Sequence, residues 1–231
     1  MKAVFFDAGG TLVHIDYPRV AAIAGRVLGR RVDPVALAAA EASGRLAVEE
    51  AMDAGMAATD SSRWQLHFQV VMRAVGIDGP EFRKVGPQVI AEHKRDNLWS
   101  AVEPGTGEAL TSLNAAGWLV ACISNADGTV ESLLERVGLR RHLAFVVDSG
   151  AVGIEKPDPR IFALALERAG MSAAESYYVG DIYPVDVVGS RAAGMVPVLL
   201  DPFGRHGDRG CRTATDVAAF CRELVSATAA A

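Results

Sequence analysis

Short apolar runs alternate with amphipathic stretches along most of the chain, and this alternation constrains the fold more than any other feature of the sequence. Continuous apolar runs of this length are typical of strands that are buried on both faces. The expected strands are 3–6, 118–123, 144–147, 176–179 and 196–200. The expected helices are 106–116, 127–137, 157–169, 185–193 and 215–225. Alternating strands and helices predict a parallel, doubly wound sheet, so we expect an α/β protein with a Rossmann-like three-layer α/β/α core.

The stretch between the first two expected strands has a different pattern. Apolar residues recur there at three-to-four spacing, as in amphipathic helices, and no strand pattern interrupts them. The expected helices are 21–28, 34–56, 64–75 and 80–93. We therefore predict a core formed by residues 1–16 and 100–231, and an inserted helical domain over residues 17–99.

Composition argues against several classes of protein. The 231 residues are 50% hydrophobic and carry a formal net charge of −5, whereas nucleic-acid-binding proteins usually present a basic face. The 3 cysteines form no CxxC pair, so neither a disulfide framework nor a zinc site is expected. The first apolar run is too short for a signal peptide or a membrane span. We expect a cytoplasmic protein, monomeric or homodimeric, without nucleic-acid or membrane partners.

Polar residues follow four of the expected strands. Parallel sheets bind ligands at the carboxyl ends of their strands, so these residues are the first candidates for a functional site. They are Asp7, Gly9, Gly10 and Thr11 after the first strand, Ser124 and Asn125 after the second, Lys156 after the third, and Asp181 and Asp186 after the fourth.

These residue types suit the transfer of a phosphoryl group. Converging carboxylates need a cation, and Mg²⁺ prefers hard oxygen ligands. The Asp7 carboxylate can attack phosphorus and form an aspartyl-phosphate. Mg²⁺, the Lys156 ammonium and the Ser124 hydroxyl would stabilise the charge on the transferred group. Gly9 and Gly10 let backbone amides approach a phosphate closely.

Four segments resemble the motifs of the haloacid dehalogenase superfamily. They are FFDAGGTL at 5–12, ISN at 123–125, EKPDP at 155–159 and VGDIYPVD at 179–186, and they occur in the family's order along the whole chain. The resemblance implies a Mg²⁺-dependent phosphatase that acts on a small phosphorylated metabolite through an aspartyl-phosphate. It also implies that the helical insertion is the family's mobile cap.

The resemblance assigns roles residue by residue. Asp7 is the expected nucleophile, with Lys156 and Ser124 as the other catalytic residues. The expected substrate-binding residues are Gly10, Thr11, Ser124, Asn125 and Lys156. The expected metal ligands are Asp7, the carbonyl of Gly9, Asp181 and Asp186, where Asp186 supports either the metal or the lysine.

Gly9 departs from the family pattern. Phosphatases of this superfamily carry there a second aspartate that protonates the leaving group and then activates water. Such acid–base catalysis contributes about 10²–10⁴-fold, so its loss should hinder the hydrolysis of alkyl phosphates most. We favour a phosphatase in which His14, Asp16 or a cap residue replaces the acid, or whose substrate needs little help.

Three alternatives remain open. Haloacid dehalogenases also lack this acid, but they use no metal and lack the Gly180–Asp181 pair. Phosphonoacetaldehyde hydrolase needs a cap lysine, and no lysine occurs between Lys2 and Lys84. The third alternative is a catalytically weak homologue that binds a phosphorylated ligand. Within the insertion, Arg45, Arg63 and Trp64 are candidate specificity residues, although solvated arginines and a core tryptophan are the plainer expectation.

Overall fold

The computed structural model describes residues 2–56, 59–204, 207 and 209–229. The chain divides into two compact units. The sheet unit comprises Met1–His14 and Val102–Ala231, and the helical unit comprises Ile15–Ala101.

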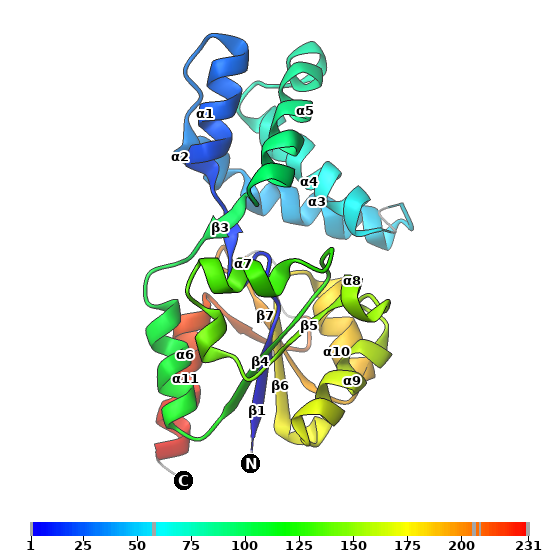
Figure 1. Ribbon diagram of the computed structural model, residues 1–231. Coiled ribbons are helices and arrows are strands. Elements are labelled where there is room, and N and C mark those ends of the chain that lie inside the picture. The colour runs from blue at the N-terminus through cyan, green and yellow to red at the C-terminus, as the bar shows by residue number, and fades with distance from the viewer. Residues whose placement is uncertain (1, 57–58, 205–206, 208, 230–231) are drawn as a thin grey trace. The chain divides into compact units, whose positions relative to one another are not determined.

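The sheet unit is built on a six-stranded parallel sheet with the order β5-β4-β1-β6-β7-β8 (Figure 1). The strands are β1 (Ala3–Phe6), β4 (Leu119–Ser124), β5 (Val146–Asp148), β6 (Ser176–Gly180), β7 (Val196–Leu200) and β8 (Arg212–Ala214). The order places β1 in the interior of the sheet and requires crossover connections, as a doubly wound fold does. The predicted α/β class with a Rossmann-like core is confirmed.

Helices cover both faces of this sheet. They are α6 (Thr106–Ala115), α7 (Val130–Arg136), α8 (Ser149–Val152), α9 (Pro159–Ala169), α10 (Val188–Ala192) and α11 (Val217–Ala229). Helices α6 and α11 pack together on one side, and α9 and α10 lie on the other (Figure 1). Short turns of other helix types lie at Arg140–His142, Ala173–Glu175 and Tyr183–Val187.

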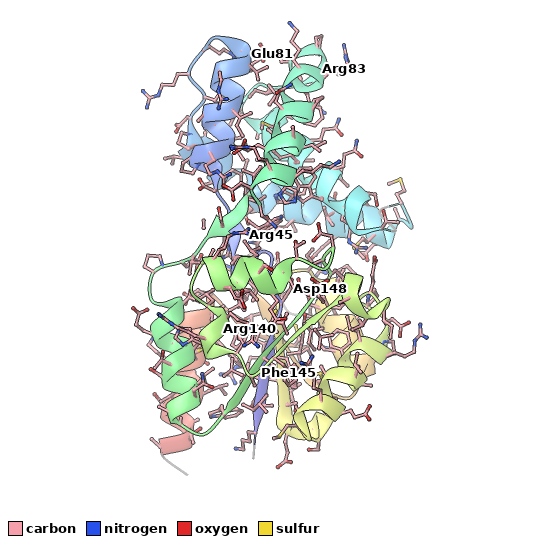
Figure 2. All side chains as sticks on the ribbon, viewed as in Figure 1. Arg45, Glu81, Arg83, Arg140, Phe145 and Asp148 are labelled. Atoms are coloured by element: carbon pink, nitrogen blue, oxygen red, sulfur yellow. The ribbon has the colours of Figure 1, made fainter. Side chains whose placement is uncertain are left out.

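Neighbouring side chains of one strand serve the two faces, because successive residues of a strand point to opposite sides. Tyr178 packs with Phe162 of α9, whereas Tyr177 packs with Phe220 of α11. The α9 face also buries Phe145, which lies just before β5, and Asp148 stands at the carboxyl end of that strand (Figure 2).

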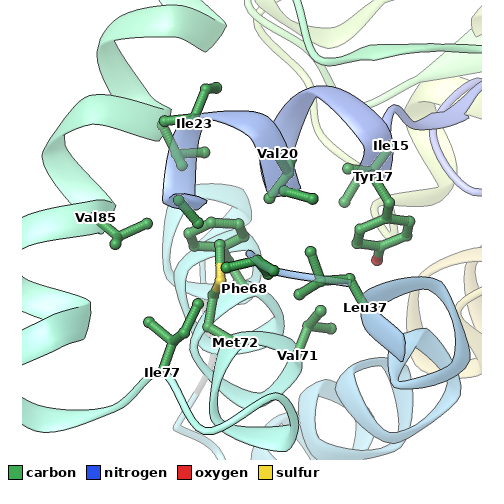
Figure 3. Close-up of a cluster of buried hydrophobic side chains, with 14 of the residues drawn as sticks. Ile15, Tyr17, Val20, Ile23, Leu37, Phe68, Val71, Met72, Ile77 and Val85 are labelled. Atoms are coloured by element: carbon green, nitrogen blue, oxygen red, sulfur yellow. The ribbon is translucent and has the colours of Figure 1, made fainter. Parts of the chain in front are cut away.

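The helical unit consists of α1 (Tyr17–Leu28), α2 (Pro34–Ala39), α3 (Glu41–Asp53), α4 (Asp60–Ala74) and α5 (Gly79–Arg95). Their apolar faces form a core of their own (Figure 3). Its fully buried members include Val20, Leu37, Val71, Met72, Ile77 and Val85. A two-stranded sheet of β2 (His14–Ile15) and β3 (Trp99–Ala101) lies where the chain leaves and returns.

Some elements differ from the sequence expectations. The helix expected over 34–56 is two helices, because the chain turns at Ala40 between α2 and α3. The helix expected over 185–193 begins as a π-helical turn at Tyr183. The strand β8 and the short helix α8 were not expected. Among the described residues, no helix is both long enough and apolar enough to cross a bilayer.

Candidate active site at the carboxyl edge of the sheet

Strand register brings the candidate residues to one level of the sheet. Phe6 at the end of β1 is aligned with Cys122 of β4 and Val179 of β6. The next residue, Asp7, donates its backbone N–H to the carbonyl of Val179 at 2.8 Å. Ser124 ends β4 and is buried at the same edge. Residues that are more than a hundred positions apart in the sequence therefore converge.

The Lys156 ammonium is the centre of the cluster. Its side chain is only 2% exposed. Its Nζ lies 2.8 Å from Asp7 Oδ1, 2.8 Å from Asp186 Oδ1 and 2.8 Å from the Tyr178 hydroxyl. An ammonium has three N–H donors, so each finds one acceptor.

Asn125 holds the backbone on which Lys156 stands. Its Oδ1 accepts the backbone N–H of Lys156 at 2.8 Å, and its Nδ2 donates to the Lys156 carbonyl at 3.0 Å. Sequence reasoning left open whether Asn125 orients a loop or contacts substrate. These two bonds favour the orienting role.

Asp186 braces the loop that follows β6. Its Oδ2 accepts the backbone N–H groups of Asp181 at 3.1 Å and Ile182 at 3.0 Å, while its Oδ1 accepts from Lys156. Gly180 makes this packing possible, because a Cβ there would lie 2.3 Å from Asp186 Cγ. Its four acceptor positions are thus largely used by the protein itself, as expected of a group that supports the lysine.

Asp181 lies against the loop that follows β1. A Cβ on Gly10 would lie 2.3 Å from Asp181 Oδ2, and Gly10 has a φ of +77° that side chains rarely adopt. Only glycine lets the carboxylate approach this closely. Gly9, in the same loop, forms a backbone bridge with Val13.

Three buried carboxylates could hold a metal ion together. Asp7, Asp181 and Asp186 each offer an oxygen, and these oxygens lie within 4.8 Å of one another. When ionised, they carry three negative charges against the single positive charge of Lys156, and an uncompensated buried charge is costly. A small divalent cation with hard oxygen ligands fits this set.

The protonation states follow from burial and from neighbouring charges. Burial raises the pKa of Asp7 to about 6, with Lys156 opposing the shift and Asp186 adding to it. Burial alone would lower the pKa of Lys156, but Asp186 and Asp7 raise it above its ordinary value. Burial raises the pKa of Tyr178 well above its usual range. At neutral pH the lysine is therefore charged and the tyrosine neutral, and a bound cation would lower the pKa of Asp7 from this raised value.

Other candidates near the first loop have different surroundings. The Thr11 hydroxyl oxygen is buried and has no hydrogen-bond partner among the described residues. His14 Nε2 lies 3.8 Å from Glu103 Oε1. Asp16 belongs to the helical unit, where its carboxylate caps α1 by accepting the backbone N–H of Arg19 at 3.0 Å.

The candidate specificity residues all lie in the helical unit. Arg45 is buried and pairs with Glu41 at 2.6 Å, and Arg63 is also buried, so neither is the solvated arginine of the plainer expectation. Trp64 stacks on Phe68 with ring centroids 5.3 Å apart and packs against the core, so the plainer expectation of a core tryptophan holds.

Sequence reasoning missed two side chains of this edge. Tyr178 reads as an ordinary core aromatic, and only its polar hydroxyl hinted at a partner. Asp148 ends β5, and its carboxylate accepts the backbone N–H groups of Gly128, Val130 and Gly150 at 2.9–3.2 Å. The signal that drew attention to Asp7, a carboxylate directly after a buried strand, applies equally to Asp148.

Comparisons with known proteins identify the family of this chain. The family model of haloacid dehalogenase-like hydrolases matches residues 1–194. The human haloacid dehalogenase-like hydrolase domain-containing protein 3 is 32% identical over 222 residues, covering 89% of this chain and 86% of that protein. The glyceraldehyde 3-phosphate phosphatase of Methanopyrus kandleri is 32% identical over 155 residues, covering 67% and 66%. The mouse and bovine counterparts of the human protein match over only 51% and 56% of their own lengths.

Solved structures of both a dehalogenase and a phosphatase have the fold of this chain. A dehalogenase superposes with a TM-score of 0.66 at 22% identity, covering 97% of each chain. A HAD phosphatase from Thermococcus onnurineus superposes with a TM-score of 0.61 at 20% identity, covering 97% of this chain and 98% of that one. Since the family model spans most of the sequence and the fold agrees with it, this chain belongs to the haloacid dehalogenase-like hydrolase family.

Proposed function

We propose that the protein is a Mg²⁺-dependent phosphatase that acts on a small phosphorylated metabolite through an aspartyl-phosphate at Asp7. The observation that carries the proposal is the Lys156 ammonium 2.8 Å from the Asp7 carboxylate, inside a group of three buried acids. Two relatives support the substrate class, the Methanopyrus phosphatase above and a ribulose-1,5-bisphosphate 5-phosphatase of Halopiger xanaduensis, 35% identical over 114 residues.

The chain's own residues supply most of the chemistry. In the proposed reaction, Asp7 Oδ attacks phosphorus in line as the bond to the leaving oxygen breaks. Ser124 and the backbone amides near Gly10 bind the oxygens of the transferred group. Lys156 joins them when the N–H that it donates to Asp7 turns to the transferred group as Asp7 attacks. Water then attacks phosphorus, which releases phosphate and regenerates the carboxylate. When bound by Asp7, Asp181, Asp186 and the Gly9 carbonyl, Mg²⁺ neutralises charge on the phosphoryl group.

Residues 17–99 act as a cap in this proposal. The cap excludes bulk water during the reaction and selects the substrate. Arg45, Arg63 and Trp64 are its candidate specificity residues.

Phosphate release from a panel of compounds tests the proposal. Acetyl phosphate, an aryl phosphate and several sugar phosphates are incubated with the enzyme, with and without Mg²⁺. We expect Mg²⁺-dependent release that Asp7→Asn abolishes. Equal release by Asp7→Asn would refute the nucleophile. If no compound releases phosphate but 2-haloacids release halide, the protein is a dehalogenase instead.

The leaving group should matter because Gly9 cannot donate a proton. We expect acetyl and aryl phosphates to react faster than sugar phosphates, since their leaving groups need little protonation. Gly9 is not among the glycines with positive φ, so an aspartate fits its backbone conformation. Gly9→Asp should then raise kcat/KM on sugar phosphates by about 10²-fold or more. No gain in a folded variant would indicate that another group, with His14 the first to test, already supplies the proton.

A further inference from the structure

Tyr178 connects two parts of the proposed site from beneath the sheet edge. Its side chain is fully buried, and its ring meets the ring of Phe162 edge-on. Its hydroxyl oxygen accepts a hydrogen bond from Lys156 Nζ at 2.8 Å. The hydroxyl also lies 3.0 Å from the carbonyl oxygen of Ile123 and 3.1 Å from Asp186 Oδ1.

Each hydrogen of the Tyr178 hydroxyl and the Lys156 ammonium can be assigned to one acceptor. The Tyr178 hydroxyl has one hydrogen, which it donates to the nearer acceptor, the Ile123 carbonyl at 3.0 Å, because Asp186 Oδ1 at 3.1 Å already accepts from Lys156. Lys156 needs three acceptors, and the tyrosine oxygen is the third beside Asp7 and Asp186. Without this oxygen, the buried ammonium would keep only the Asp7 and Asp186 carboxylates of these three acceptors.

The Ile123 carbonyl belongs to the peptide that leads into Ser124. A hydroxyl bonded to this carbonyl and to Lys156 therefore joins the two residues that bind the transferred group in the proposed reaction. The Tyr178 ring itself packs on the α9 face of the sheet.

We propose that Tyr178 is a positioning residue of this enzyme, whose hydroxyl aims the Lys156 ammonium at Asp7 and fixes the backbone that carries Ser124. The proposal rests on the proposed phosphatase function. Phenylalanine would fill the same space against Phe162, so the hydroxyl itself is what the role requires.

The neighbouring tyrosine provides a matched control. Tyr177 lies in the same strand on the opposite face, against Trp118 and Phe220. Tyr177→Phe and Tyr178→Phe remove the same atom from adjacent residues of β6. A general effect on the strand would appear in both variants, whereas loss of positioning would appear only in Tyr178→Phe.

Steady-state kinetics give the first measurement. We expect kcat of Tyr178→Phe to fall about ten- to a hundredfold, the effect of losing a hydrogen bond to a charged group, with KM changed less than about threefold. Tyr177→Phe should retain kcat. A Tyr178→Phe enzyme with the kcat of Tyr177→Phe would overturn the proposal, and so would a rise in KM alone.

Lysine NMR tests the same contact without any turnover. The chain has four lysines, Lys2, Lys84, Lys94 and Lys156, so ¹⁵N-lysine labelling gives few ammonium signals. We expect one signal in slow exchange with water, absent in Lys156→Arg, and exchanging at least about tenfold faster in Tyr178→Phe but not in Tyr177→Phe. Unchanged slow exchange in Tyr178→Phe would contradict the aiming role.

The two measurements separate the two proposals. A wild-type protein that releases no phosphate but shows the expected exchange rates would refute the phosphatase and leave the Tyr178–Lys156 contact established. If Tyr178→Phe does not fold, the contact is tested in the wild-type protein. There it requires a nuclear Overhauser effect between the Lys156 ammonium and the Tyr178 ring. Its absence would overturn the inference.

Discussion

His67 is a buried imidazole in the helical unit, packed against the backbone at Gly44. A Cβ on Gly44 would lie 2.7 Å from His67 Nδ1, so the ring has little room. Burial lowers the pKa of His67 to about 4, with Glu41 opposing the shift and Arg45 adding to it. The folded protein therefore keeps this histidine neutral under conditions in which an exposed histidine would be charged.

The sign of the pH dependence follows from this shift. Between pH 6.5 and about 4 the unfolded chain binds a proton at His67 and the folded chain does not, so acid favours unfolding. Above pH 6.5 His67 is neutral in both states and does not reduce stability. As the pH drops from 6.5 to about 4, the free energy of unfolding falls by about 3 kcal/mol because of this histidine. Comparing urea unfolding of His67→Phe and wild type at pH 7.5, 6 and 5 should show the wild type losing stability faster. A pH-independent difference would contradict the assigned pKa.

Individual residues also show how much of the candidate site could be predicted from the sequence. Asp7, Lys156 and Asp186 were predicted to converge because they follow strands of one parallel sheet, and the structure brings them within hydrogen-bond distance. Tyr178 could not be found in this way, since its strand position is that of a core residue. Its partners come from a strand and a loop whose approach only the folded chain defines.

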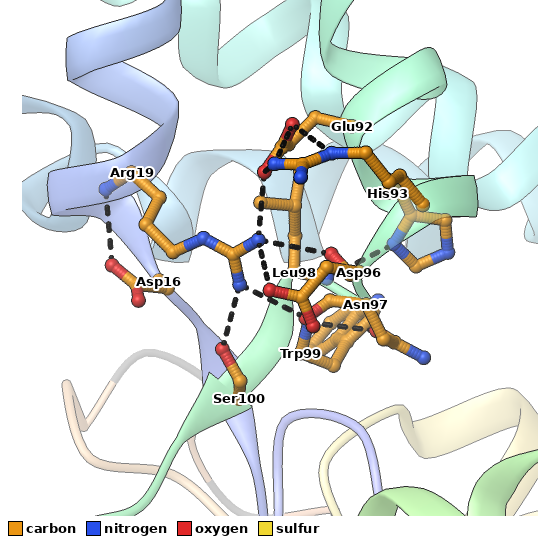
Figure 4. A network of polar contacts seen from close by, with 10 residues as sticks. Asp16, Arg19, Glu92, His93, Asp96, Asn97, Leu98, Trp99 and Ser100 are labelled. Carbon is orange, nitrogen blue, oxygen red and sulfur yellow. Dashed lines mark hydrogen bonds and ion pairs between the residues drawn. The ribbon is translucent and has the colours of Figure 1, made fainter.

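At the scale of elements, Arg19 connects α1 by hydrogen bonds to other segments of the helical unit. Its guanidinium reaches from α1 to the end of α5 and the start of β3 (Figure 4). It donates to Glu92 at 3.0 Å, to the Asp96 carboxylate at 2.8 Å and to Ser100 Oγ at 3.3 Å, as well as to two backbone carbonyls. One side chain thus ties the first helix of the unit to the returning chain.

Removing this link should weaken the helical unit. Arg19→Met keeps the aliphatic stem and deletes every hydrogen bond of the guanidinium, so we expect a loss of about 1–3 kcal/mol in the free energy of unfolding. Arg30→Met is the control, because Arg30 pairs with Glu81 of the same α5 at 2.7 Å with both side chains 42% exposed. Such an exposed pair contributes about 0–1 kcal/mol. Equal losses in the two variants, measured by urea unfolding, would show that Arg19 is an ordinary surface residue.

Elements were predictable where the apolar pattern was long, and not where it was short. Strand β7 begins and ends where the sequence indicated, because five apolar residues in a row leave little choice. The strand β8 has three residues, Arg212–Ala214, and joins the sheet edge through backbone bonds that no side-chain pattern records. The turn at Ala40 lies among alanines without glycine or proline, so local sequence gave no sign of it.

For the molecule as a whole, we expect Mg²⁺ to stabilise the sheet unit, where the three acids converge. Binding only to the folded state adds about 1.4 kcal/mol at ten times Kd. Tryptophans report each unit separately, since Trp118 belongs to the sheet unit, and Trp64 and Trp99 belong to the helical unit.

The measurement uses a protein with Trp64→Phe and Trp99→Phe, which leaves Trp118 as the sole indole. The thermal unfolding midpoint reported by Trp118 should rise on addition of Mg²⁺. In the same protein carrying Asp181→Asn as well, Mg²⁺ should leave the midpoint unchanged. A midpoint indifferent to Mg²⁺ in the parent would exclude a metal site at these carboxylates.

The helical unit comes from one uninterrupted stretch of chain, Ile15–Ala101, whereas the three acids, Ser124 and Lys156 of the candidate site come from outside it. In the gene, this means that a single exchange between codons 15 and 101 replaces the whole unit and leaves the codons of Asp7, Ser124, Lys156, Asp181 and Asp186 untouched. In the proposed function the helical unit selects the substrate, so a chimera made at these two junctions should keep the proposed catalytic residues and change the substrate.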